Sequence, residues 1–342
     1  MTHQLPSSKQ FSEGERVRMG RVQLPFNMSI SFKASVISSA LMTVFLSLLF
    51  LLLFYFGNYA SVSEWIVALL LCSAEILLLF LIMPYYASSL YLRYVTPFAL
   101  LAIAALALPR MGTLPLWSVQ LSSDWLSLLM GLALTCYFAY RSLRALQGYS
   151  YQETPIQLAS PLRSGCYAVV HGGSRTIINY HVVNTAQRYA NDIVKLNRWG
   201  CRARGVYPKR LDAYCIFGEN IYSPCDGVIT NVIDDCPDLT PGETDHTHPA
   251  GNHVIIEYEG RKILLAHMKQ ESVLVREAEQ VHRGQCIGKV GNSGNTSEPH
   301  LHIHIEYGGK PDRFGDGVGA PILFEEKRFL KRNDLLVIRD KI

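Results

Sequence analysis

The sequence has no CxxC pair and little net charge, and each absence argues against one kind of site or partner. Without paired cysteine spacing, a zinc site built from thiolates is not expected. The formal net charge is only +4 over 342 residues, which gives no reason to expect a nucleic-acid surface or partner. Hydrophobic residues make up 49% of the chain, because a very apolar first half is averaged with an ordinary soluble second half.

Charge is also absent from Val36 to Phe56, and this run predicts a transmembrane helix. At about 1.5 Å per residue, the run crosses a hydrocarbon core of about 30 Å. A second span is predicted from Trp65 to Met83, and two shorter candidates follow at Tyr94–Leu108 and Trp125–Tyr140. We therefore expect an all-α transmembrane bundle of about four helices over residues 36–140, after a cytoplasmic segment at 1–35, with the lipid bilayer as a partner.

Beyond the apolar half, the chain changes character twice. Polar residues with Gly148, Pro155 and Pro161 predict a linker over residues 141–164. Short strand-like runs between glycine or proline turns then predict an all-β domain over 165–342, antiparallel and similar to a barrel-sandwich. One helix is expected there, across Ala186–Leu196.

Six of the eight cysteines lie in this second half, and they leave two interpretations open. They form disulfide bonds if the domain meets an oxidising compartment, or they are buried free thiols. If a bridge forms, we expect it between Cys225 and Cys236, which flank the segment DGVITNVIDD.

Ten of the eleven histidines lie between His171 and His304, and three of them alternate along one predicted strand. Side chains in a strand repeat every two residues, so His300, His302 and His304 share one face while aliphatic residues face the core. Neighbouring imidazoles repel one another when protonated, so this face indicates a metal site or a pocket. His181, Asp192 and His267 offer further ligands, and catalytic zinc commonly takes three N or O ligands.

In the order in which they occur, these segments resemble the lysostaphin-type (LytM-like) zinc endopeptidases, which hydrolyse bacterial cell walls. The resemblance covers roughly Ser164 to Tyr307 and includes SPCDG, GNHVIIEY, LLAHM and VHRGQCIGKVGNSGNTSEPHLHIHIE. It implies one Zn²⁺ per chain with His181, Asp192 and His302 as ligands. It also implies that His267 and His300 are the catalytic pair, which exchange a proton with the attacking water and help hold the oxyanion.

Two departures from the family pattern leave alternatives open. The family spaces its first His and Asp as HxxxD, whereas His181 and Asp192 are eleven positions apart, so His171 remains a rival first ligand. His304 exceeds the usual HxH pair, and it either supports the metal ligands or faces solvent. The remaining histidines are expected to be structural or solvated; they are His246 and His248 in a loop, His253 and His282.

The expected function is therefore a membrane-anchored zinc metalloendopeptidase that hydrolyses peptidoglycan cross-links or stem peptides. The alternative is a non-catalytic module of the same fold that binds cell wall or regulates a hydrolase. The enzyme is favoured because every role in the family mechanism has a candidate residue.

The side of the membrane depends on the number of spans. Five basic residues before the first span predict a cytoplasmic amino terminus. Four spans then place the β-rich domain in the cytoplasm, whereas three spans place it outside, with one short segment re-entrant. We expect the outside location, since the presumed substrate is there and the two short segments leave the fourth crossing open.

Overall fold

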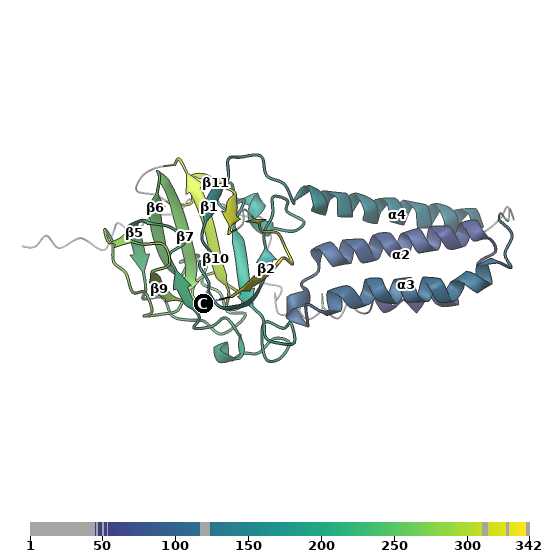
Figure 1. The fold of residues 1–342 in the computed structure, drawn as a ribbon, viewed down its shortest axis with the longest axis horizontal. Coiled ribbons are helices and arrows are strands. Elements are labelled where there is room, and N and C mark those ends of the chain that lie inside the picture. Colours follow the sequence, from purple (N-terminus) through teal and green to yellow (C-terminus); the bar gives the residue numbers. More distant parts are fainter. Residues whose placement is uncertain are drawn as a thin grey trace, which may run out of the picture.

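The computed structural model describes residues 45–339, apart from positions 46, 50 and 53 and segments 117–123, 310–313 and 326–327. Long helices form one end of the molecule and a β-rich domain forms the other (Figure 1). The helices α2 (Val62–Ile82), α3 (Leu92–Met111) and α4 (Asp124–Gln147) lie side by side, and a shorter apolar helix spans Ser47–Phe56.

Helix α2 has sequence signals at both ends. Its N-cap Ser61 accepts a hydrogen bond from the Glu64 backbone N–H, and the Glu64 carboxylate accepts one from the Ala60 backbone N–H, an arrangement that differs from a capping box by one residue. The helix ends at Ile82, just before Met83 and Pro84, because the residue preceding a proline avoids the helical conformation. Helices α2 and α3 are long and apolar enough to cross a membrane.

The helices are longer than the sequence predicts. The predicted span Tyr94–Leu108 lies within α3, whose 20 residues include Pro97 and Pro109. Each proline removes one helical hydrogen bond without ending the helix. The predicted Val36–Phe56 span lies partly outside the described residues, and its described part is helical.

The boundary between the two ends also differs from the prediction. Helix α4 continues to Gln147, so the first part of the predicted linker 141–164 is helical, because Leu143, Ala145 and Leu146 are strong helix formers. The domain also begins before residue 165, since Ile156–Leu158 forms a strand that pairs with Ile322–Phe324.

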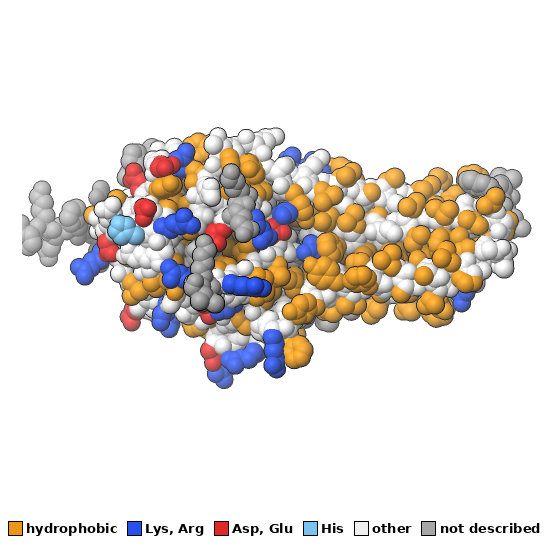
Figure 2. Space-filling model, viewed as in Figure 1, with side chains coloured by type: hydrophobic (Ala, Val, Ile, Leu, Met, Phe, Trp, Pro, Cys, Tyr) orange, Lys and Arg blue, Asp and Glu red, His pale blue; other side chains and the backbone are white. Residues whose placement is uncertain are grey.

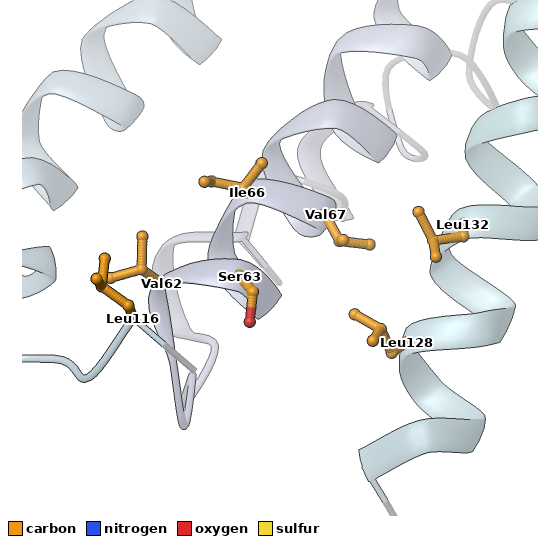
Figure 3. Close-up of a pocket in the computed structure, with 7 residues that line it drawn as sticks. All are labelled: Val62, Ser63, Ile66, Val67, Leu116, Leu128 and Leu132. Atoms are coloured by element: carbon orange, nitrogen blue, oxygen red, sulfur yellow. The ribbon is translucent and has the colours of Figure 1, made fainter. Parts of the chain in front are cut away.

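Figure 2 shows that the visible face of the helical end is mostly hydrophobic, whereas charged side chains gather on the β-rich end. An apolar pocket between α2 and α4 is lined by Val62, Ser63, Ile66, Val67, Leu116, Leu128 and Leu132 (Figure 3). This lining contains one hydroxyl and no titratable group, so the pocket has no means of acid–base or metal chemistry.

The β-rich domain carries the strands β1 (Ile156–Leu158), β2 (Gly165–His171), β3 (Asn191–Lys195), β4 (Asn220–Tyr222), β5 (Gly227–Ile233), β6 (Asn252–Tyr258), β7 (Arg261–Met268), β8 (Gln280–Val281), β9 (Cys286–Lys289), β10 (Leu301–Tyr307), β11 (Val318–Ala320), β12 (Ile322–Phe324), β13 (Arg328–Phe329) and β14 (Leu335–Ile338). The main sheet has the order β14-β2-β3-β10-β7-β6-β5-β8, with β11 also paired to β10. The β-rich prediction is confirmed, although β1 and β12 pair in parallel.

Strand β10 occupies the centre of this sheet and explains the alternating pattern. Leu301, Ile303 and Ile305 belong to the main hydrophobic core, as predicted. The opposite face, with His302 and His304, is also buried, so it is not a solvated strand face.

Two sequence predictions in this domain are wrong. The predicted helix across Ala186–Leu196 is replaced by β3, because Ile193 and Val194 are β-branched and pair with β2, and Ile193 also pairs with β10. The Cys225–Cys236 bridge does not form, because all eight cysteines, each within the described residues, are free thiols.

Candidate metal centre

Asp192 is the centre of a buried cluster, because β3 lies between β2 and β10. It is directly opposite His302 on β10, and Asp192 Oδ1 lies 2.8 Å from His302 Nδ1. The other carboxylate oxygen, Oδ2, lies 2.9 Å from His181 Nε2. All three residues are at most 5% exposed, so the sheet encloses two imidazoles and one carboxylate together.

His181 reaches this cluster from a short 3-10 helix, η2 (Tyr180–Val183). The side chain of Asn179 caps η2 by accepting a hydrogen bond from the His181 backbone N–H. The buried Asn179 amide also donates to the carbonyl oxygens of Gly173 and Ala190, at 2.9 and 3.0 Å. These bonds fix the turn that aims His181 at Asp192. The sequence pattern does not identify Asn179, because its contacts with Gly173 and Ala190, six and eleven positions away, depend on how the turn folds.

His171, the rival first ligand, takes a different place. It pairs with Asp192 across β2 and β3, but its ring packs against Tyr180 and His181. Its Nδ1 has no hydrogen-bond partner among the described residues, and burial lowers its pKa well below the usual histidine value. The structure therefore brings His181, rather than His171, to the carboxylate.

His267 and His300 lie beside the cluster with their ring orientation fixed. His267 Nδ1 lies 2.9 Å from the Ser293 carbonyl oxygen, and His300 Nδ1 lies 2.9 Å from that of Glu298. A carbonyl only accepts, so each Nδ1 carries the proton and each Nε2 keeps its lone pair. His300 Nε2 is 3.6 Å from Asp192 Oδ1, and the two rings are 4.8 Å apart. Both imidazoles can therefore accept a proton at the edge of the cluster.

The backbone of His267 is in an unusual conformation for a residue with a side chain. Its φ is 60°, in the left-handed region, which costs about 1–3 kcal/mol. The conformation is maintained because its N–H donates to the Ala250 carbonyl oxygen at 3.0 Å and its ring donates to Ser293. Strain of this kind clusters at functional sites, which is consistent with a role for this imidazole.

His304 supports the cluster from the side opposite Asp192. Its Nδ1 lies 2.8 Å from His302 Nε2, and its ring packs on Phe314. His304 is 1% exposed, which excludes the solvent-facing alternative. Its role in the site is to contact His302 on the side away from Asp192.

The charge states suit metal binding. Burial alone would raise the pKa of the Asp192 carboxyl, but the surrounding imidazoles outweigh it and hold that pKa well below its usual range. Burial lowers the pKa of His302 to about 4 and that of His267 well below its usual value. At neutral pH Asp192 is therefore ionised and His302 and His267 are neutral, the forms in which these side chains bind a metal ion or accept a proton.

Zinc fits this donor set. His181, Asp192 and His302 place one ligand atom each within 4.8 Å of one another, as do His267, His300 and His302. The first set contains the only carboxylate of the two, and two imidazoles with one carboxylate match the three protein ligands of a catalytic zinc site. The structure thus brings together all five residues that the sequence predicted for the site.

The remaining histidines lie elsewhere, as expected. His246 and His248 are in an exposed loop, and His248 bonds to Asp245. His253 is held by Gly251 and Asn231. His282 is exposed and lies 3.5 Å from Asp226.

Residues 209–313 match the family model described as Peptidase family M23, so the chain contains an M23 (LytM-type) peptidase domain in this region. The match includes His267, His300 and His302, whereas His181 and Asp192 precede it.

Two curated proteins are similar to part of the chain. The peptidoglycan DD-endopeptidase ShyA of Vibrio cholerae is 32% identical over 95 residues, which cover 28% of this chain and 19% of ShyA. Lipoprotein NlpD of Yersinia enterocolitica is 42% identical over 60 residues, which cover 18% of this chain and 60% of NlpD. The chain therefore spans less than two thirds of either relative.

Among solved structures, a zinc-containing peptidase from Vibrio cholerae shows 31% identity, with a TM-score of 0.21, over 27% of this chain and 24% of its own. The lysostaphin catalytic domain from Staphylococcus simulans shows 17% identity, with a TM-score of 0.22, over 34% of this chain and 83% of its own. These scores are low, so the family match rests on the sequence of residues 209–313.

Proposed function

We propose that this protein is a membrane-anchored zinc endopeptidase that hydrolyses peptide bonds in peptidoglycan cross-links or stem peptides. The observation that carries the proposal is the buried His181, Asp192 and His302 cluster with His267 and His300 beside it. Zinc bound there would acidify a water molecule and polarise the scissile carbonyl.

The residues of the chain would bind the ion, orient a ligand and transfer protons. His181, Asp192 and His302 would hold the ion, and His304 would orient His302 through their 2.8 Å contact. His267 and His300 present Nε2 lone pairs, so either would accept a proton from the attacking water and return it to the leaving amine. In its protonated form, the same imidazole would stabilise the oxyanion.

The substrate class is supported by the M23 match and by similarity to a relative named as a peptidoglycan DD-endopeptidase. Both a cross-link and a stem peptide contain the peptide bond that such a site would hydrolyse.

The bilayer is the second proposed partner. Helices α2 and α3 meet the length and composition needed to cross it, and their outer faces expose large apolar side chains such as Leu70, Phe98 and Leu101. We place the peptidase domain outside the cytoplasm, where peptidoglycan is assembled.

The alternative is a non-catalytic module of the same fold that binds cell wall or regulates another hydrolase. It is consistent with the similarity to lipoprotein NlpD, whose name does not state an enzymatic activity. The complete donor set argues against it, because a binding module has no need of a carboxylate and four imidazoles gathered in one cluster.

The deciding experiment uses the full chain in detergent. We expect one zinc per chain by elemental analysis, and soluble fragments with new amino and carboxyl termini after incubation with purified peptidoglycan. A chelator should abolish the release, and added zinc should restore it. Zinc binding without cleavage of either cross-links or stems would favour the non-catalytic module.

A further inference from the structure

A buried ion pair between Arg202 and Glu298 lies outside the cluster described above, and Glu298 is two positions before His300 in the chain. Arg202 Nε lies 2.6 Å from Glu298 Oε1, and Nη2 lies 2.7 Å from Oε2, so the pair is bidentate. The Arg202 side chain is 0% exposed and that of Glu298 is 9% exposed. A buried pair persists only where further hydrogen bonds satisfy its polar atoms, so its other contacts are informative.

On one side, Arg202 is bound to the connection between α2 and α3. Its Nη1 donates to the Ala87 carbonyl oxygen at 3.1 Å, and its backbone N–H donates to that of Tyr86 at 3.1 Å. The neighbouring Leu90 N–H donates to Gly200, at 2.9 Å. The connection also packs against the sheet through one buried hydrophobic cluster. Its members are Tyr85, Tyr86, Ala87 and Leu90 on the connection, and Ala168, Val170, Val194 and Leu196 in and next to β2 and β3.

On the other side, Glu298 is bound to His300. The Glu298 carbonyl oxygen accepts from His300 Nδ1 at 2.9 Å and from Thr296 Oγ1 at 2.8 Å. The same residue therefore pairs with Arg202 through its side chain and fixes the His300 tautomer through its backbone. A displacement of Glu298 would turn the His300 ring and move its Nε2 relative to Asp192.

We propose that Arg202 and Glu298 are positioning residues, which tie the orientation of His300 to the α2–α3 connection. The inference rests on the proposed function for its effect on hydrolysis, but the orientation itself does not depend on activity. The guanidinium suits this task because it bonds two carboxylate oxygens in its plane and still reaches the Ala87 and Val206 carbonyl oxygens. A lysine at this position would keep the positive charge but could not form the two parallel hydrogen bonds to the Glu298 carboxylate.

The test compares two variants of the full chain with a matched control. Arg202→Lys keeps the charge, and the double variant Arg202→Met with Glu298→Leu replaces the pair with apolar residues of similar size, which buried pairs often tolerate. The control is Arg210→Lys, in an ion pair with Asp212 whose arginine is 81% exposed. We expect kcat to fall about 10- to 100-fold in the first two, with KM within about twofold, because small displacements in an active site have effects of this size. Zinc should stay at one per chain, and the control should match the wild type.

The second readout is independent of hydrolysis. In ¹⁵N-histidine-labelled protein, the His300 signal is assigned by its loss in His300→Gln, and the wild type should show an Nδ1–H tautomer. In both test variants this signal should shift or broaden. A wild-type His300 signal and wild-type kcat in either variant, folded and loaded with zinc, would overturn the proposal. If the wild type cleaves no peptidoglycan, the proposed function fails, while the His300 signal still decides the positioning role.

Discussion

The Nδ1 atom of His302 lies 2.8 Å from Oδ1 of Asp192, although 110 positions separate the two residues in the chain. The contact follows from the register of β3 and β10, in which these residues are direct partners. Side chains held by central strands are positioned more accurately than those on loops, so this pair is the fixed part of the site. His181, on a 3-10 helix, completes it.

Removal of His302 should therefore abolish metal binding. His302→Ala leaves two ligands, which hold zinc weakly, so we expect zinc by elemental analysis to fall from about one per chain to near zero. Asp192→Asn should act in the same direction. The control is His253→Gln, because His253 bonds to Gly251 and Asn231 on another part of the sheet. Undiminished zinc in His302→Ala would contradict the ligand assignment.

His267 and His300 should be separable from the ligands. His267→Gln and His300→Gln should keep zinc but lower kcat by about 100-fold or more, because each removes a group that transfers a proton. Turnover and zinc content are measured on the same samples. If either variant loses its zinc while its circular dichroism is unchanged, the division between ligands and catalytic residues is wrong.

His304 should affect metal affinity rather than stoichiometry. With zinc on His302 Nδ1, the Nε2–H of that ring donates to His304 Nδ1, and His304→Phe removes the acceptor while keeping an aromatic ring beside Phe314. Loss of such a partner typically lowers affinity about 10- to 100-fold. Competition with a chromogenic chelator measures this, with the exposed His282→Gln as control. Equal affinities for the wild type and His304→Phe would show that His304 only fills space.

The sequence predicted those parts of the site that depend on local pattern. His300, His302 and His304 follow from the two-residue period of a single strand, and the structure places His302 and His304 on β10, with His300 immediately before it. The residue type of Asp192 offers a ligand, but only the resemblance assigns its role, and its segment is a strand rather than the predicted helix because of its neighbours. The choice between His171 and His181 depends on the Asn179 cap, whose partners lie at Gly173 and Ala190. No local pattern predicts such contacts.

The Arg202–Glu298 pair shows the same limit more strongly. The two residues are 96 positions apart, and although Glu298 lies in the segment GNSGNTSEPHLHIHIE, no motif contains Arg202 or predicts that the two residues pair. Their pairing depends on the placement of the α2–α3 connection against the β-rich domain, and only the folded structure contains that information. The lengths of α3 and α4 differ from the prediction for a related reason: prolines and polar residues predict helix boundaries, but neighbouring residues continue each helix.

The last prediction concerns the side of the membrane. Three features oppose the outside placement. Helix α3, at 20 residues, is long enough to cross, and Arg93, Arg141 and Arg144 lie near the helix ends that adjoin the β-rich domain (Figure 1). The α2–α3 connection also packs on that domain, which puts the domain on the side of the amino terminus if both the predicted Val36–Phe56 span and α2 cross the membrane. Basic residues at helix ends favour the cytoplasm. We nevertheless expect the outside location, because a peptidoglycan hydrolase must reach peptidoglycan.

In a variant without native cysteines, Glu243→Cys, at an exposed site, should react with a membrane-impermeant thiol reagent in intact cells. Ser12→Cys reports the side of the amino terminus in the same experiment. Protection of Glu243→Cys until the cells are lysed would place the domain in the cytoplasm, and peptidoglycan would then be excluded as substrate while the zinc site remained.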